Sequence, residues 1–231
     1  MKRFGNRSSL VGLASLGAIL LVIVLIGRSS PPEEFLGTRL TSGYPATPFE
    51  LTDQFGQTVS LSDYDGKVVL LTFLYTNCPD VCPIVTSQLR KTHEMLGDIA
   101  DEVAFVAISV DPDRDSVEEA RAFSDDWDMT DNWAFLVGDE KELSPIWKAY
   151  YLDPAINVQS REDADDHAED VSTQTHDHDG VNAAGQDIEN RYLVSHSTPV
   201  YLIDRKGIMR VVSTPPLDID ILIHDIKLLV D

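Results

Sequence analysis

Apolar residues gather in a few short runs along the chain, and these runs predict most of its strands. Residues 68–75 and 103–110 are almost continuously apolar and rich in β-branched side chains, which is typical of strands buried on both faces. Residues 49–61 instead form two alternating runs around a Gly-containing turn, which predicts a β-hairpin. Further strands are predicted at residues 133–137, 199–204 and 208–212.

Four segments, three between these strands and one after the last of them, have the apolar spacing and end signals of helices. Pro79 suits the first turn of a helix that extends to about Leu96. Ser116, with Glu119 three residues later, predicts the capped start of a second helix that ends near Ser124. The other two are predicted at residues 140–150 and 218–230. Helices between buried strands indicate a layered α/β domain with right-handed crossovers and an antiparallel edge.

The N-terminal region carries an uncharged apolar run, residues 10–26, which is just long enough to cross a bilayer. Lys2, Arg3 and Arg7 precede it, so the positive-inside rule places the N-terminus in the cytoplasm. We therefore expect a single-pass cell-membrane protein with an anchor at 1–28, a linker rich in Pro and Gly at 29–47, and a domain at 48–231 facing outward. A cleaved signal peptide is the alternative, although no A-x-A-like site follows the run.

Charge narrows the possible partners. With 39 acidic and 18 basic residues, the formal net charge is −21, and such a surface repels nucleic acid. Abundant Asp and scarce Lys also fit a halophilic surface, whose self-repulsion is screened by salt. Residues 157–190 have few large apolar side chains, which predicts a solvated acidic insertion. Its histidines could collect metal loosely or simply belong to a polar loop; they are His167, His176 and His178.

The chain has only two cysteines, Cys78 and Cys82, at the junction of a buried strand and a helix. A helix N-terminus stabilises thiolates, so this position favours reactive sulfurs. Residues i and i+4 share a helical face, so both sulfurs could reach one ion. The same pair could close a disulfide, as thiols outside the cytoplasm tend to do.

Four motifs in order along the chain resemble the Sco/SenC family of copper proteins. Residues 75–83 read Tyr-Thr-Asn-Cys-Pro-Asp-Val-Cys-Pro, and residues 109–115 read Ser-Val-Asp-Pro-Asp-Arg-Asp. Residues 194–197, Val-Ser-His-Ser, precede the strand segment Tyr-Leu-Ile-Asp at 201–204, and Gly66-Lys67 precedes the first buried strand. The resemblance covers about residues 45–231 without the insertion.

The resemblance implies a thioredoxin-like fold with an N-terminal β-hairpin extension, and copper bound through Cys78, Cys82 and His196. It also implies a copper chaperone that delivers copper to the binuclear copper centre of a cytochrome c oxidase subunit. Soft thiolates select Cu(I), and an imidazole keeps Cu(II) acceptable. The alternative is a thiol–disulfide oxidoreductase that uses Cys78 and Cys82 to keep the oxidase cysteines reduced. The threonine-proline context of peroxiredoxins is absent before Cys78.

Several other residues near these motifs have two interpretations. Thr198-Pro199 resembles the cis-proline element that faces the cysteines of thioredoxin-like proteins, but a trans proline that starts a strand is the alternative. The acidic residues after the second buried strand could support the metal ligands, although we expect them to cap the next helix; they are Asp111, Asp113 and Asp115. His93 and His224 are expected to be ordinary helix residues.

Overall fold

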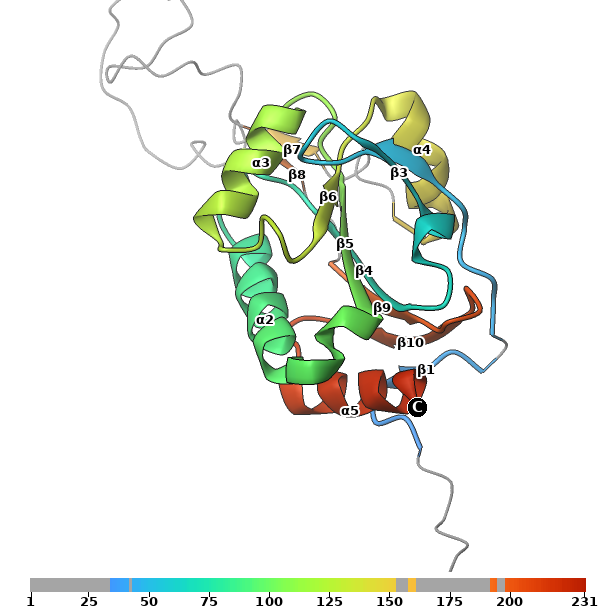
Figure 1. Cartoon of the computed structure of the whole chain (residues 1–231). Helices are drawn as coiled ribbons and strands as arrows, with labels where there is room; N and C mark the ends of the chain where they lie inside the picture. The colour runs from blue at the N-terminus through green and yellow to red at the C-terminus, as the bar shows by residue number, and fades with distance from the viewer. Residues whose placement is uncertain (1–33, 42, 153–157, 161–191, 195–197) are drawn as a thin grey trace, which may run out of the picture. The chain divides into compact units, whose positions relative to one another are not determined.

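The centre of the sheet explains why two runs of the sequence are almost entirely apolar. In the computed structural model, β4 (Val68–Leu74) and β5 (Val103–Ser109) pair in parallel, and every residue of both strands is buried. They lie inside a six-stranded sheet of order β1-β10-β9-β4-β5-β6 (Figure 1). The remaining strands of this sheet are β1 (Thr38–Arg39), β6 (Ala134–Leu136), β9 (Val200–Ile203) and β10 (Met209–Ser213). The buried parallel pair and the antiparallel edge are both confirmed.

The structure describes residues 34–41, 43–152, 158–160, 192–194 and 198–231, and Phe35–Asp231 forms one unit. Within those ranges no helix combines the length and hydropathy that a bilayer crossing needs. The run at 10–26 lies outside them, so the membrane anchor stays a prediction. His196 and most of the segment 157–190 also lie outside the described residues.

Helices cover both faces of the sheet. α2 (Val81–Leu96) and α5 (Ile219–Val230) pack together on one face, where His93 of α2 meets the ring of Phe105 at 5.4 Å between centroids. On the other face Tyr150, which ends α4 (Glu140–Ala149), contacts the ring of Phe73 at 5.3 Å. Since strand side chains alternate between faces, these contacts assign one helical layer to each face (Figure 1). The predicted α/β layering is therefore confirmed.

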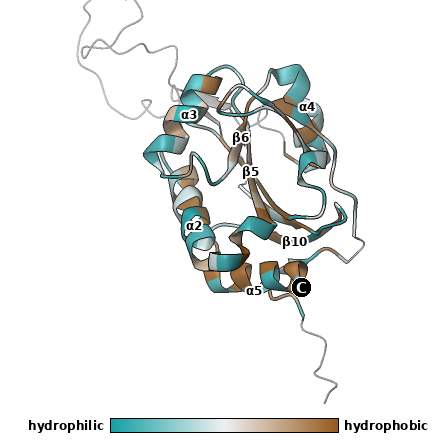
Figure 2. Ribbon diagram, in the orientation of Figure 1, coloured by the Kyte–Doolittle hydropathy of each residue, from teal (hydrophilic) through white to brown (hydrophobic). Residues whose placement is uncertain are grey.

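The helix ends follow the capping residues of the sequence. Ser116 caps α3 (Val117–Asp126), as predicted. Its side chain accepts from the backbone N–H of Glu119, and the Glu119 side chain accepts in return from the backbone N–H of Ser116. Asp218 caps α5, because its side chain accepts from the backbone N–H groups of Asp220 and Ile221. Hydrophilic residues alternate with hydrophobic ones along these helices, whereas the central strands are mostly hydrophobic (Figure 2).

The predicted hairpin is also present and is fastened to the far edge of the sheet. β2 (Glu50–Thr52) and β3 (Thr58–Ser60) pair across a turn in which Gly56 has a positive φ of 76°. The side chain of Gln54, which is buried, donates to the carbonyls of Thr130 and Trp133 and accepts from the N–H of Phe135. This amide links the hairpin to β6 and its approach. Two short 3-10 helices follow β3 and α2, at Leu61–Tyr64 and Gly97–Glu102.

Some elements were not anticipated. β1 lies inside the segment 29–47, for which only a linker was predicted, and it pairs antiparallel with β10. A separate two-stranded ribbon pairs β7 (Val158–Ser160) with β8 (Tyr192–Val194), so the acidic segment 161–191 is bracketed by a strand on each side. β1 has two exposed residues and so carries no hydrophobic pattern that could be detected from the sequence.

Candidate metal centre

Both cysteines lie at the junction between β4 and α2. β4 ends at Leu74, and the N–H of Cys78 bonds to the carbonyl of Tyr75 at 3.4 Å, which turns the chain tightly. α2 then begins at Val81, so Cys82 lies in its first turn. Cys82 is fully buried, whereas Cys78 retains 8% exposure, and both are free thiols. Cys78 is therefore the sulfur that a partner can reach first.

The expectation that both cysteines share one helical face was wrong. Cys78 precedes the helix, whose N-cap residue is Asp80. The residue before a proline is driven out of the helical region by the proline ring, and Pro79 has this effect on Cys78. The two side chains still meet, because the backbone N–H of Cys82 donates to Sγ of Cys78 at 3.4 Å.

Hydrogen bonds around the two sulfurs shift the pKa values of the two cysteines in opposite directions. A hydrogen bond from the Cys82 thiol lowers the pKa of Cys78; burial opposes this, while the backbone N–H groups of Asp80 and Cys82 and the Tyr75 side chain reinforce it. The same hydrogen bond raises the pKa of Cys82, together with burial and the charges of Cys78 and Asp115. Cys78 is therefore the more acidic of the two thiols and the one that ionises first.

A loop after β5 closes over the cysteine turn from the neighbouring strand. Arg114 pairs with Asp111 at 2.5 Å, and its guanidinium lies 5.7 Å from the centroid of the Tyr75 ring. The carboxylate of Asp115 accepts from both the N–H and the hydroxyl of Thr76. Burial raises the pKa of Asp115 to about 6, although its hydrogen bonds from Ser109 and Thr76 oppose that rise.

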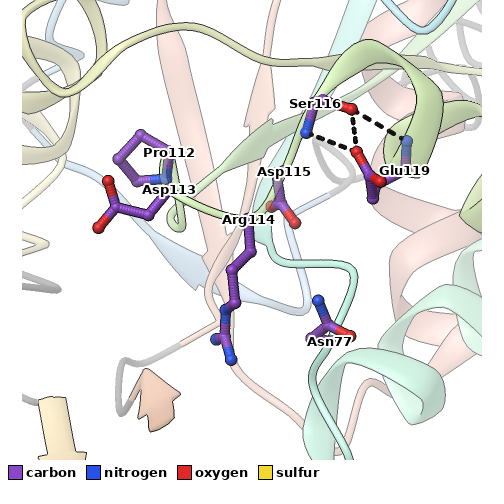
Figure 3. Close-up of a pocket in the computed structure, with 7 residues that line it drawn as sticks. All are labelled: Asn77, Pro112, Asp113, Arg114, Asp115, Ser116 and Glu119. Carbon is purple, nitrogen blue, oxygen red and sulfur yellow. Dashed lines mark hydrogen bonds between the residues drawn. The ribbon is translucent and has the colours of Figure 1, made fainter. Parts of the chain in front are cut away.

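The three aspartates of this loop have different surroundings, and none caps α3, because Ser116 occupies that position. Asp111 and Asp115 are buried, whereas Asp113 is exposed beside a cleft of about 530 Å³. Figure 3 shows that cleft, with the Arg114 side chain lying between those of Asp113 and Asn77 in this view. The cleft is lined by Asn77, Pro112, Asp113, Arg114, Asp115, Ser116 and Glu119. The interpretation of these aspartates as helix caps was therefore wrong.

The third predicted ligand, His196, lies outside the described residues. Thr198 and Pro199, which follow it, are buried, and the carbonyl of Pro199 accepts from the hydroxyl of Thr72 at 3.1 Å. β9 runs antiparallel to β4 with Val200 opposite Thr72. Thr198 and Pro199 therefore run toward the end of β4 that leads to Cys78.

No group of three or more metal-binding side chains occurs among the described residues. His93 packs against Phe105, as already seen, and His224 is a half-buried residue of α5, so both are ordinary helix residues as expected. The Thr198–Pro199 bond is not cis; the cis bond in the described part of the chain is Pro215–Pro216. Pro199 thus has a trans bond and directly precedes β9, in agreement with the alternative interpretation.

Two contacts of the site were not predicted from the sequence. The Tyr75 side chain hydrogen-bonds the Cys78 sulfur, and Asp115 binds Thr76 across 39 positions of sequence. A signal for the second did exist, since the carboxyl ends of adjacent parallel strands meet at one edge of a sheet. Nothing local in the sequence indicates which of the three aspartates would make that contact.

Comparison with known proteins agrees with this geometry. The family model described as SCO1/SenC matches residues 41–180. The chain belongs to the SCO1/SenC family. It is 32% identical over 182 residues to the SenC protein of Rhodobacter capsulatus, covering 71% of this chain and 76% of that one. It is 33% identical over 96 residues to a SCO1 homologue of Bacillus subtilis, covering 41% and 50% of the two chains.

Solved structures of the family share the fold. ScoI of Bradyrhizobium japonicum with copper bound is 26% identical, with a TM-score of 0.60 over 80% of this chain and 99% of that one. Apo Sco1 of Thermus thermophilus is 25% identical, with a TM-score of 0.62 over 86% and 98%. The predicted thioredoxin-like fold of Sco proteins is confirmed. The chain spans between half and two thirds of the length of the first curated relatives.

Proposed function

We propose that this SCO1/SenC protein is a copper chaperone that holds copper through Cys78, Cys82 and His196. The observation that carries the proposal is the meeting of the two sulfurs at the start of α2, with a backbone N–H directed at Cys78. Two sulfurs in a mostly buried site are soft donors of the kind that selects Cu(I). Copper binding is further supported by the copper-bound structure of a relative of the same fold.

The chain's own residues supply both binding and release. Cys78 is the more acidic thiol, and Cys82 must also lose its proton to become the second ligand, so uptake of copper releases protons. Because Cys82 is fully covered while Cys78 retains 8% exposure, an acceptor approaches copper from the Cys78 side. This geometry fits the transfer of copper to another protein, which by family resemblance is the copper-accepting subunit of cytochrome c oxidase.

His196 is the ligand that the described residues do not include. Its assignment is supported by the order of the motif and by the direction of Thr198 and Pro199 beside β4. Imidazole is an acceptable ligand for both oxidation states of copper, and two thiolates alone favour Cu(I). We therefore assign to His196 the retention of Cu(II).

Thiol–disulfide exchange is the second candidate function, and the unlike thiols favour it. The Cys78 thiolate would attack one sulfur of a partner disulfide and release the other as a thiolate. Cys82 would then attack Cys78 in the mixed disulfide, giving a Cys78–Cys82 disulfide and the second partner thiol. The pair loses two electrons and the partner gains them, so one turnover needs no other reductant.

Location is a separate part of the proposal. The basic residues before the apolar run 10–26 support an uncleaved anchor with the domain outside the cytoplasm. Labelling intact cells with a membrane-impermeant maleimide tests it. Modification of Cys78 in the membrane fraction agrees with the proposal, whereas modification only after lysis contradicts the outward orientation.

A titration of the reduced full chain with Cu(I) against a chromophoric chelator tests the function itself. We expect one equivalent bound, and transfer of that equivalent to the reduced copper domain of the oxidase subunit. A chain that binds copper no better than its Cys78→Ser/Cys82→Ser variant contradicts the copper proposal. Reduction of that domain's disulfide without copper transfer would favour the exchange function instead.

A further inference from the structure

Asp115 fastens the cysteine turn to the neighbouring strand. Its side chain is almost entirely buried, and both of its oxygens are used. Oδ1 accepts from the backbone N–H of Thr76 at 3.0 Å and from the Thr76 hydroxyl at 2.6 Å. Oδ2 accepts from the hydroxyl of Ser109 at 2.6 Å. The carboxylate thereby joins the segment after β4, the last residue of β5 and the approach to α3.

The position of Thr76 gives this contact its importance. The parallel ladder of β4 and β5 ends with Leu74 opposite Ser109, and the N–H of Val110 makes a last bond to the carbonyl of Leu74 at 3.0 Å. Beyond that point no strand partner receives the Thr76 N–H, and Asp115 takes it instead. Two residues later the chain reaches Cys78.

We propose that Asp115 is a positioning residue that sets where the chain turns away from β4, and so the spacing of the Cys78 and Cys82 sulfurs. This inference deepens the proposed function and rests on it, because the sulfur spacing matters only if the pair binds an ion or reacts as a pair. Cys82 is fixed by α2, whereas Cys78 lies on the turn itself. A change at Asp115 therefore moves one sulfur relative to the other.

The test needs a readout of sulfur spacing that does not depend on copper. Phenylarsine oxide provides one, because its arsenic forms one bond to each of two neighbouring sulfurs and one water leaves. We compare wild type, Asp115→Ala and Asp115→Asn in the reduced full chain, for both this arsenical and Cu(I). Loss of a group that supports metal ligands typically costs about 10–100-fold in affinity.

For Asp115→Ala we expect both affinities to fall by about tenfold or more. Asp115→Asn keeps an oxygen that accepts from Thr76, so it should remain within about threefold of wild type. Thr76→Val, which removes only one hydroxyl donor, should show a small loss and serves if Asp115→Ala does not fold. Unchanged affinities in Asp115→Ala, or in Thr76→Val as its substitute, overturn the proposal.

Asp225 provides the matched control. It is also a buried carboxylate, and it accepts two backbone N–H groups, from Leu36 and Gly37, at 2.8 Å each. Asp225→Ala should reduce stability by a similar amount yet leave both affinities at the wild-type value. Equal losses in the two alanine variants would mean general destabilisation and overturn the proposal. If wild type retains the arsenical but not copper, the copper function fails while the role of Asp115 is still decided.

Discussion

Two buried carboxylates, one at the centre of the sheet and one at its edge, show how the same interaction serves different ends. At the edge, Asp225 of α5 takes the N–H groups of Leu36 and Gly37 and holds the segment that leads into β1. At the centre, Asp115 takes one N–H and two hydroxyls and holds the turn that carries Cys78. β1 lies three strands from β4, about 14 Å at a strand spacing of about 4.8 Å.

The surroundings of the two carboxylates explain the contrast. Gly37 approaches so closely that an added Cβ would lie 2.7 Å from Cγ1 of Val211 and 2.9 Å from Oδ2 of Asp225. The edge at β1 is therefore closely packed, and it contains neither cysteine. The centre instead carries two unequal thiols, and Asn77, the residue before Cys78, lines the cleft. A buried carboxylate alone therefore does not mark a functional site. The segment that the carboxylate holds in place distinguishes the two cases.

Removal of either sulfur should have the largest effect and should be confined to the centre. Cys78→Ser or Cys82→Ser is expected to weaken Cu(I) binding by more than the ~100-fold that loss of a supporting residue can cost, and to abolish disulfide exchange. Competition titration and an exchange assay with an oxidised peptide measure the two effects. A single-cysteine variant that keeps full exchange activity would refute the role of the pair.

Asp225→Ala should have the next largest effect, confined to the edge. It leaves two partly buried N–H groups without their acceptor, each at about 1–2 kcal/mol, the lower part of the range for a buried group, so urea unfolding should show a loss of about 2–4 kcal/mol. Copper affinity should not change. A loss of copper affinity in a fully folded Asp225→Ala protein would break the separation of the two regions.

Gly37→Ala should destabilise the edge more mildly, because a methyl group is forced against Val211 and Asp225. Overpacking of this kind costs about 1–3 kcal/mol, which thermal unfolding can measure. Gly56→Ala is a useful companion, since nothing lies within 4 Å of its added Cβ and only its positive φ opposes the change. Full stability in Gly37→Ala would mean that the edge is not closely packed.

The alkylation rates of the two thiols at the centre should depend differently on pH. A lowered pKa keeps Cys78 ionised below the usual thiol pKa of about 8.5, so its alkylation by iodoacetamide should stay fast as pH falls from 8 toward 6. The raised pKa of Cys82 should keep that residue slow throughout. Peptide mapping by mass spectrometry follows both residues. Equal rates for the two thiols would contradict the assigned asymmetry.

Much of the fold could be predicted from periodicity and capping residues. The continuous apolar runs identified β4 and β5, and Ser116 with Glu119 identified the start of α3. β1 could not be found in this way, because two exposed residues carry no hydrophobic pattern and their pairing with β10 depends on tertiary structure. Helix starts were less certain: Pro79 indicated a helix that in fact begins at Val81.

The site was predictable to the extent that its chemistry is local. Two cysteines four residues apart at a strand–helix junction indicated the pair, and motif resemblance added His196. The unequal pKa values arise from burial and from hydrogen bonds that only the folded turn makes. The link from Asp115 to Thr76 depends on the parallel pairing of β4 and β5, so sequence could offer three aspartates but not select one.

The central claim is that Cys78, Cys82 and His196 form one copper site, and the most direct measurement compares copper binding by wild type and His196→Ala. The reduced full chain is titrated with Cu(I) against a chelator and then with Cu(II) under spectroscopic detection, with His224→Ala as the matched histidine control. We predict a sharp loss of copper affinity in His196→Ala, greatest for Cu(II), with disulfide exchange largely intact and His224→Ala like wild type. Equal copper affinity in wild type and His196→Ala would contradict the three-ligand site.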